Sequence, residues 1–268
     1  MEPKTLNREL GNALALLDNG NPAEALKIIN SYLKKTNDDP DAHFYHGDVL
    51  AELGDIEEAI RAYRTGLSFS PDDPDALTTL GDLLFETAKY QEALEQYRSV
   101  LRLDPDDADA LVSIGLVYNA LEKAEEAAQA FSQAIEKEPE NIFALNALGD
   151  LYYATGNQKA AIELYQKAIF QDPQDPNAYH SLGELYYDLQ EYDLAEENCK
   201  MAVKFAPDFS MAYLTLGSIC MDQERMEDAL KFYKMYLKYE KSSQAADMLA
   251  EVKAVMEGLQ EEIAVGNR

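Results

Sequence analysis

The chain contains no tryptophan, and Cys199 and Cys220 are its only cysteines. Both cysteines fall at apolar positions of the repeat pattern described below, so we expect buried, reduced thiols and no disulfide framework. The sequence has no apolar run long enough to span a membrane, and its first residues lack the basic and apolar regions of a signal peptide. We therefore expect a cytoplasmic location.

Positive charge is also scarce. The chain has 23 Lys and Arg residues against 50 Asp and Glu residues, which gives a formal net charge of -27 and a pI near 4.3. Nucleic acids and anionic lipid surfaces are bound mainly by Lys and Arg, so this balance argues against both as direct ligands. It favours a basic partner, which an acidic surface attracts most strongly at low salt.

No group of residues in the sequence indicates catalysis. His43 and His46 lie three residues apart and could contact one metal ion, but such a site needs further ligands at matching geometry. Other repeats place apolar residues at these two positions, so we interpret both histidines as packing residues. There is no glycine-rich phosphate-binding loop, because the glycines are evenly spaced rather than clustered. We expect no enzymatic activity, no metal and no cofactor.

Glycine recurs at an interval of 34 residues, and other small and aromatic residues keep the same interval. An interval kept this strictly indicates one supersecondary unit repeated along the chain. The glycines are Gly47, Gly81, Gly115, Gly149, Gly183 and Gly217. Alanine lies five residues before and twelve residues after each of them, and proline closes five units. Sixteen residues after each glycine stand Tyr63, Tyr97, Phe131, Tyr165, Cys199 and Tyr233.

This pattern resembles the tetratricopeptide repeat, which has the same period and the same order of glycine, alanine, aromatic residue and proline. The tryptophan usual in that repeat is replaced by His43, Leu77, Leu111, Leu145, Tyr179 and Tyr213. The resemblance implies an all-α, right-handed superhelical solenoid of seven helix-turn-helix repeats, followed by a C-terminal capping helix. It implies nothing specific about the partner, because one repeat fold serves many unrelated partners.

The period divides the chain into units, which we expect to form a single solenoid domain over residues 1–268. A degenerate first repeat covers about 6–39, and six clear repeats cover 40–73, 74–107, 108–141, 142–175, 176–209 and 210–243. Asp-Pro pairs at 39, 73 and 175 predict helix starts, and Gly20, Gly54 and Gly156 predict turns within repeats. A capping helix is expected over 244–262, with its inner side formed by Ala246, Leu249, Val252, Val255, Met256 and Leu259.

The resemblance also implies that positions 2, 5, 9, 12 and 13 of each repeat line a concave groove, and no Lys or Arg occupies any of them. Asp48, Asp82, Asp150 and Glu184 share position 9, in mid-helix. Glu52, Glu86 and Asp188 stand near helix ends, where the helix dipole disfavours a carboxylate. These acids are either solvated charge or a surface for a basic ligand. Four aromatic candidates stand beside them, as anchors for a partner or as packing between helices: Phe44, Phe85, Tyr153 and Tyr187.

The leading hypothesis from the sequence is a non-enzymatic adaptor that binds a peptide or helix with Lys or Arg and apolar anchors in this acidic groove. One alternative is a scaffold that assembles head to tail, with the degenerate first repeat and its Lys34 and Lys35 docking into another copy. Certain magnetosome-associated tetratricopeptide scaffolds are similar in general plan. A third reading is a detached accessory domain of an enzyme complex.

Overall fold

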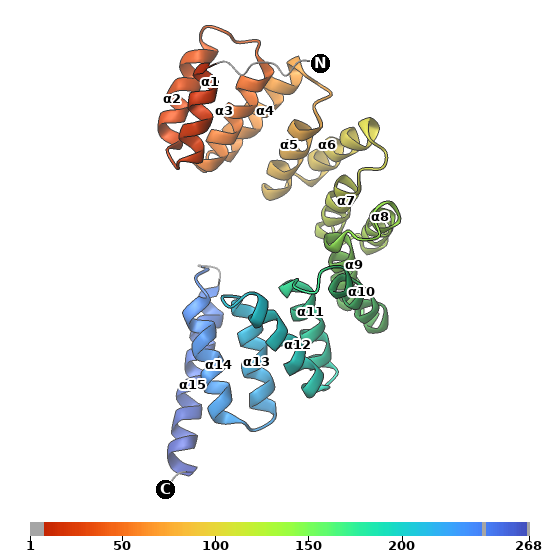
Figure 1. Ribbon diagram of the computed structural model, residues 1–268, viewed down its shortest axis with the longest axis vertical. Coiled ribbons are helices and arrows are strands. Elements are labelled where there is room, and N and C mark those ends of the chain that lie inside the picture. The colour runs from red at the N-terminus through yellow and green to blue at the C-terminus, as the bar shows by residue number, and fades with distance from the viewer. Residues whose placement is uncertain (1–7, 243–244, 267–268) are drawn as a thin grey trace. The chain divides into compact units, whose positions relative to one another are not determined.

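The computed structural model describes residues 8–242 and 245–266, which form helices and no strand. Contacts divide the chain into two compact units, Met1–Lys137 and Glu138–Arg268, and each is described by itself. The first unit holds four helix pairs (Figure 1). Their helices are α1 (Arg8–Asp18), α2 (Pro22–Leu33), α3 (Pro40–Glu52), α4 (Ile56–Phe69), α5 (Pro74–Glu86), α6 (Tyr90–Leu103), α7 (Ala108–Ala120) and α8 (Ala124–Lys137).

The second unit holds three helix pairs and a final helix. Its helices are α9 (Ile142–Ala154), α10 (Gln158–Gln171), α11 (Pro176–Asp188), α12 (Tyr192–Phe205), α13 (Ser210–Asp222), α14 (Met226–Tyr239) and α15 (Ala246–Gly266). We call the odd-numbered helix of each pair, α1 to α13, the first helix, and its even-numbered partner the second helix. The predicted all-α fold of seven helix-turn-helix repeats followed by one more helix is confirmed for the described residues.

The predicted helix starts are confirmed by their capping hydrogen bonds. Asp73 precedes α5, and its Oδ1 accepts a hydrogen bond of 3.0 Å from the backbone N–H of Ala76. Asp39 and Asp175 cap α3 and α11 in the same way, each with proline at the first helical position. Each cap satisfies a backbone donor that the helix itself leaves without a partner, which fixes where the first helix begins.

The turns within the repeats use left-handed backbone, as the sequence predicted at three of them. Gly20, Gly54 and Gly156 have φ values of 72°, 82° and 83°. The remaining four repeats place a residue with a side chain in the same conformation, at φ values between 57° and 60°. Those residues are Ala88, Glu122, Gln190 and Glu224.

The 34-residue interval records one contact that is made again in each repeat. In five of the six clear repeats an aromatic ring from the second helix covers the glycine of the first helix. A Cβ added at Gly81 would lie 2.5 Å from Cε1 of Tyr97, and at Gly149 it would lie 2.6 Å from Cε1 of Tyr165. In the sixth repeat the sulfur of Cys199 takes the place of the ring, 2.5 Å from a Cβ built on Gly183. Glycine is therefore required because the second helix occupies the space of its side chain.

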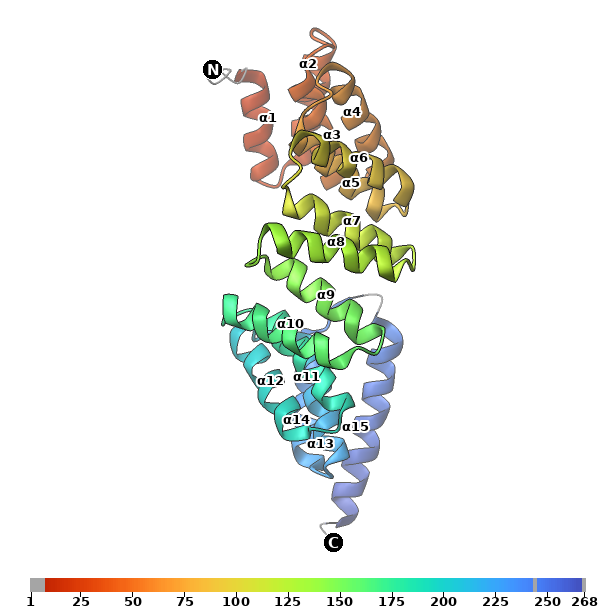
Figure 2. The ribbon, with the colours of Figure 1, turned by 90° about the vertical axis from the view of Figure 1, so that its right-hand side faces the viewer.

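The first repeat and the final helix each pack on the neighbouring helices. In the first unit, Leu10, Ile29 and Tyr32 of α1 and α2 form a buried cluster with Ala42 and Val49 of α3, so the degenerate first repeat is folded onto its neighbour. In the second unit, α15 lies beside α14, which packs on α13 (Figure 2).

The final helix differs in two details from its prediction. Val252, Met256 and Leu259 are buried, as expected. Ala246 is exposed, so its assignment to the inner side is wrong. The helix ends at Gly266, not at 262, and the predicted start at 244 lies outside the described residues. None of the described helices is both long enough and apolar enough to cross a membrane.

Candidate partner-binding surface

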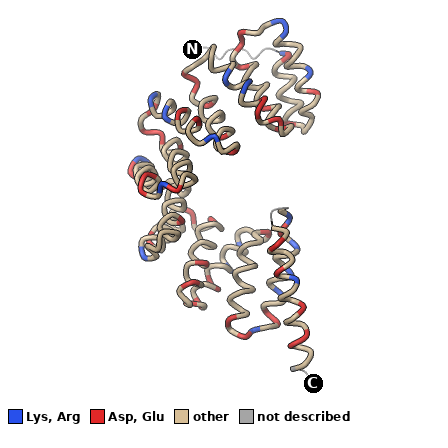
Figure 3. Tube along the Cα trace, turned by 180° about the vertical axis from the view of Figure 1, so that it is seen from behind, with Lys and Arg blue, Asp and Glu red and all other residues tan. Residues whose placement is uncertain are grey.

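Positive charge is distributed unequally between the first and second helices of the repeats. The first helices α3, α5, α7, α9, α11 and α13 contain no Lys or Arg. Most of the Lys and Arg residues lie on second helices or in turns (Figure 3). The first helices do carry carboxylates: Asp41, Asp48, Glu52, Asp75, Asp82, Glu86, Asp109, Asp150, Glu184, Asp188 and Asp222.

The ion pairs follow the same division. Lys89 pairs with Glu57 at 2.6 Å, and Arg225 and Lys200 both pair with Glu196, at 2.5 Å and 2.6 Å. Throughout residues 8–242 and 245–266, no carboxylate of α3, α5, α9, α11 or α13 is paired with Lys or Arg. The negative charge of these five first helices is therefore not neutralised by the basic residues that the structure describes.

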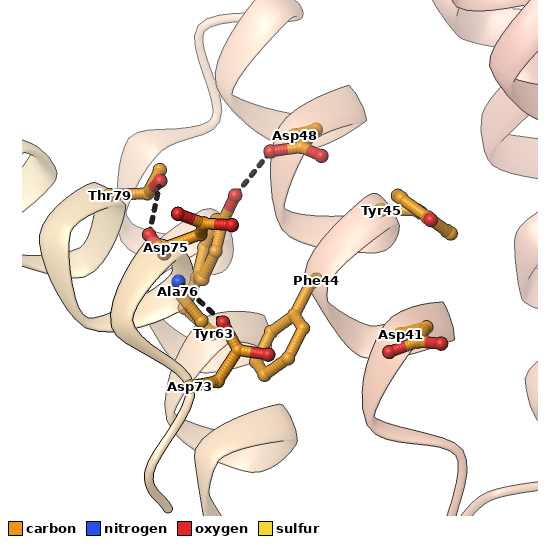
Figure 4. A pocket seen from close by; sticks show the side chains of 9 residues that line it. All are labelled: Asp41, Phe44, Tyr45, Asp48, Tyr63, Asp73, Asp75, Ala76 and Thr79. Atoms are coloured by element: carbon orange, nitrogen blue, oxygen red, sulfur yellow. Dashed lines mark hydrogen bonds between the residues drawn. The ribbon is translucent and has the colours of Figure 1, made fainter. Parts of the chain in front are cut away.

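Two adjoining pockets lie on the first helices of the first unit. The one we call the acidic pocket has a volume of about 290 Å³ and lies between α3 and α5, with walls from both helices (Figure 4). Asp41, Tyr45 and Asp48 come from α3, and Asp73 and Asp75 come from the start of α5. The rest of its lining is Phe44, Tyr63, Ala76 and Thr79.

The second pocket, which we call the apolar pocket, has a volume of about 490 Å³. Asp48 borders it as well, so the two pockets share this side chain. Glu52 and Glu86 add two further carboxylates at its rim. Its apolar lining comes from α1, α3, α4 and α5: Leu17, Ala51, Ile56 and Leu83.

Three of the mid-helix acids at position 9 accept a hydrogen bond from a tyrosine hydroxyl of the same repeat. Tyr97 donates a hydrogen bond of 2.7 Å to Oδ1 of Asp82, and Tyr63 donates one to Oδ1 of Asp48. Burial raises the pKa of Asp48, although the hydrogen bond from Tyr63 acts in the opposite direction. Burial and the adjacent carboxylate together raise the pKa of Tyr63 well above its ordinary value. These acids therefore help to hold the second helix on the first, a role that the sequence analysis did not assign to them.

The four aromatic candidates have different environments. Phe44 is only 8% exposed, and it stacks on Tyr63 and packs over Gly66. Of the two roles that the sequence left open for Phe44, the structure shows packing between helices, because position 5 of this repeat faces the neighbouring second helix. Phe85 is half-buried and packs against Tyr90, with ring centroids 5.6 Å apart.

In the second unit the aromatic candidates join neighbouring first helices. The hydroxyl of Tyr153 on α9 donates a hydrogen bond of 2.6 Å to Oδ2 of Asp188 on α11. Burial and a hydrogen bond to Asp222 raise the pKa of Tyr187 to about 12. Each tyrosine at position 12 thus interacts with the acid at position 13 of the next repeat. Pairing across repeats therefore brings Tyr153 and Asp188 together, whereas Tyr187 interacts with Asp222.

Glu184 has a different environment from the other acids at position 9. Its repeat has Cys199 where the others have an aromatic ring, so no tyrosine hydroxyl is available to it. His180 lies 3.6 Å away, but burial lowers the pKa of His180 to about 4, so this ring is neutral at neutral pH. Burial, with Asp188 and Asp150 nearby, raises the pKa of Glu184. Glu184 is therefore a half-buried carboxylate that pairs with no Lys or Arg among the described residues.

Several residues of the surface were missed by the sequence reasoning. Tyr45 and Thr79 share position 6 of their repeats and line the acidic pocket, yet position 6 was not counted as part of the groove. Tyr63 was assigned only to packing, although its hydroxyl reaches Asp48. The separation of fifteen residues between an acid at position 9 and a tyrosine, repeated in three units, is the signal that would have revealed these hydrogen bonds.

The paired helices, short left-handed turns and glycine–aromatic contacts define a helical repeat protein. Models of the tetratricopeptide repeat match residues 10–74, 78–142, 149–190 and 180–246. These matches cover most of the chain, so the protein belongs to the tetratricopeptide repeat family, as the sequence pattern predicted. Proteins of this family are protein–protein interaction modules. No curated protein matched the sequence.

Solved structures of other tetratricopeptide repeat proteins share the fold. A tetratricopeptide repeat protein from Parabacteroides merdae matches with a TM-score of 0.75 and 19% identity, over 91% of this chain and 96% of the other. A MamA chain from Desulfovibrio magneticus RS-1 matches with a TM-score of 0.57 and 25% identity, over 64% of this chain and 99% of the other. PilF from Pseudomonas aeruginosa matches with a TM-score of 0.61 and 19% identity, over 74% and 90%.

Proposed function

We propose that this protein is a non-enzymatic adaptor whose first helices bind a partner segment that carries Lys or Arg and apolar anchors. The observation that carries the proposal is the absence of Lys and Arg from the first helices of the clear repeats. Six successive first helices hold carboxylates but no Lys or Arg. The carboxylates of five of them, α3, α5, α9, α11 and α13, are also outside every Lys or Arg ion pair found among the described residues.

Helix stability alone does not account for this arrangement. Glu52 and Glu86 stand at the last positions of α3 and α5, where the helix dipole opposes a negative charge by about 0.3–1 kcal/mol each. Both are exposed, and both border the apolar pocket. Carboxylates beside apolar side chains in one pocket provide what a basic and partly apolar segment requires, because charge steers the encounter and apolar contact supplies affinity.

The first unit offers the better-formed surface, because its two pockets adjoin and share Asp48. In the second unit we propose that Asp150, Glu184 and Asp188 contribute in the same way, beside the rings of Tyr153 and Tyr187. Glu184 is the member of this group best suited to accept a cation, because neither a tyrosine hydroxyl nor a charged histidine neutralises it.

Charge reversal on the first helices tests the proposal. Fluorescent peptides that combine Arg and Leu in a glycine–serine background are titrated with the wild-type protein and with the Glu52→Lys, Glu86→Lys double variant. Lysine at these helix ends suits the dipole, so the variant keeps its fold while the surface loses its charge. We expect binding to weaken about ten-fold or more at low salt.

The matched control places the same charge change on second helices of the same unit. Glu95 and Glu136 are exposed on α6 and α8. The Glu95→Lys, Glu136→Lys variant has the same net charge as the test variant, and we expect it to bind nearly as the wild type does. Equal weakening in both variants would attribute binding to the overall charge of the chain and would reject the first helices as the binding surface.

The scaffold alternative has its own observable in the same experiment. It requires the first repeat to dock into a second copy, whereas Lys35 of that repeat pairs with Glu9 of α1 at 3.3 Å. Light scattering on the full chain, at the concentrations used for the titrations, measures self-association directly. A concentration-dependent increase in mass that the Glu52→Lys, Glu86→Lys variant abolishes would favour the scaffold over the adaptor.

A further inference from the structure

The two pockets of the first unit differ in chemistry although they adjoin. The acidic pocket has carboxylates on opposite walls, with Asp41 and Asp48 on α3 and Asp73 and Asp75 at the start of α5 (Figure 4). The apolar pocket is lined by four apolar side chains, together with Asp48, Glu52 and Glu86. Because Asp48 borders both, a segment that crosses this side chain enters the two pockets with neighbouring side chains of its own.

The opposed walls of the acidic pocket favour a planar cation with several donors. Asp48 already accepts a hydrogen bond from Tyr63, and Asp73 accepts one from the backbone of Ala76, so each directs only part of its acceptor capacity into the pocket. Asp41 and Asp75 stand on opposite walls and form no ion pair with a described Lys or Arg. A guanidinium group presents donors in several directions in one plane and can bond to both walls at once, whereas an ammonium group acts as a point charge.

The apolar pocket favours an aliphatic side chain. Leu17, Ala51, Ile56 and Leu83 offer it carbon surface, and a branched or unbranched aliphatic group gains by leaving water there. Glu52 and Glu86 at the rim disfavour an acidic residue in the same segment. The two pockets therefore differ in the type of side chain that their lining favours.

We propose that the first unit recognises an arginine and an aliphatic residue at one fixed separation in a partner protein, with the arginine in the acidic pocket and the aliphatic side chain in the apolar pocket. This inference rests on the proposed function and goes further than it, because a merely acidic groove would accept any basic and apolar segment. Complementarity of charge identifies the partner residue for the acidic pocket, and the aliphatic lining identifies the residue for the other.

The test uses full-length protein and a series of synthetic peptides. Each peptide carries one Arg and one Leu in a glycine–serine background, and the separation between them increases stepwise from one residue to six. Matched peptides replace Arg by Lys or Ala, or Leu by Ala. Fluorescence anisotropy gives the affinity of each. We expect one separation to bind about ten-fold tighter than the others, and Lys to bind more weakly than Arg at that separation.

Two protein variants link each peptide residue to its pocket. Asp41→Asn with Asp75→Asn should weaken binding of the Arg peptide about ten-fold and leave the peptide with Ala in place of Arg unchanged. Leu17→Ala should weaken binding of the Leu peptide and leave the peptide with Ala in place of Leu unchanged. Circular dichroism confirms that each variant is folded, and Glu95→Gln with Glu136→Gln controls for loss of two charges.

The outcomes separate this inference from the proposed function. Arg–Leu peptides that bind equally at all separations, with variants that affect all peptides alike, would overturn recognition at one fixed separation. The proposed adaptor for a basic segment would still stand. If neither the Arg nor the Lys peptides bind at any separation, both proposals are overturned. The proposal is supported if each protein variant loses affinity only for peptides that carry the residue assigned to the altered pocket.

Discussion

The hydroxyl of Tyr165 donates a hydrogen bond of 2.6 Å to Oδ1 of Asp150, fifteen residues earlier in the chain. The ring of the same tyrosine covers Gly149, the residue before that aspartate. Tyr97 has the same relation to Asp82 and Gly81. One tyrosine thus contacts two successive residues of the first helix. Its ring packs on the glycine, its hydroxyl donates a hydrogen bond to the aspartate, and both contacts hold the two helices of a repeat together.

Removing the hydroxyl of Tyr165 should weaken the contact between the two helices without disturbing the packing of the ring. We expect Tyr165→Phe to lower the free energy of unfolding by about 1 kcal/mol, since Asp150 is exposed and water can replace the lost donor. Urea denaturation of Tyr165→Phe, Asp150→Ala and the double variant measures the coupling. Additive effects would show that the hydrogen bond does not contribute to stability.

The glycine at position 8 should tolerate no side chain. A Cβ at Gly81 would lie 2.5 Å from Cε1 of Tyr97, so we expect Gly81→Ala to cost about 1–3 kcal/mol by overpacking. Gly258 in α15 provides the matched control, because nothing lies within 4 Å of a Cβ built there. Alanine there should stabilise the helix by about 0.5–1 kcal/mol. Denaturation midpoints that move in the same direction for both variants would contradict the packing explanation.

The left-handed turns offer a stabilising change. Gln190 has a φ of 60°, where a residue with a Cβ is strained and glycine is not. Gln190→Gly should therefore raise the free energy of unfolding by about 1 kcal/mol, although most glycine substitutions destabilise a protein. Gly54→Ala, at a φ of 82°, should do the reverse. A loss of stability in Gln190→Gly would show that the turn gains more from the glutamine side chain than it loses in strain.

Glu184 should make stability depend on pH. Burial raises its pKa in the folded protein, so its contribution to stability is fully present below the unfolded pKa and is lost as the pH rises through the folded pKa. Ionised Glu184 is then a destabilising charge at neutral pH. We expect Glu184→Gln to be more stable than wild type at neutral pH, with the gain shrinking as the pH falls toward 4.5, the ordinary glutamate pKa.

Thermal denaturation across this pH range, with Glu163→Gln on α10 as the control for a lost charge, measures the effect. A gain that stays constant with pH would show that the titration of Glu184 is not its cause. If the same Glu184→Gln variant also binds basic peptides more weakly, the cost in stability is explained by a binding role for the carboxylate.

The fold was largely predictable because each repeat leaves the same marks in the sequence. Asp-Pro pairs, left-handed glycines and the 34-residue interval located helix starts, turns and repeats, and all of these follow from local geometry. The four turns without glycine were less visible, because Ala88 and Gln190 carry no sign of a positive φ in their residue type. In the final helix, helical spacing placed Ala246 on the inner side, but this first residue of α15 is exposed.

The candidate surface was predicted only in part. The absence of Lys and Arg from the groove positions follows from the repeat register alone. The sequence could not decide between the two roles of Phe44, because the same repeat position faces solvent or a neighbouring helix according to the residues beside it, here Tyr63 and Gly66. The pairing of Tyr153 with Asp188 joins two repeats, and its geometry depends on how neighbouring repeats pack. Such contacts between side chains are not recorded in the period of a single repeat.

The most direct test of the central proposal is the affinity of an Arg–Leu peptide for wild-type protein and for the two charge-matched variants, measured by fluorescence anisotropy at low salt. Binding that falls about ten-fold in Glu52→Lys, Glu86→Lys and remains near the wild-type value in Glu95→Lys, Glu136→Lys is the predicted result. Wild-type affinity in the first variant would contradict the assignment of the acidic first helices as the surface that binds a basic partner.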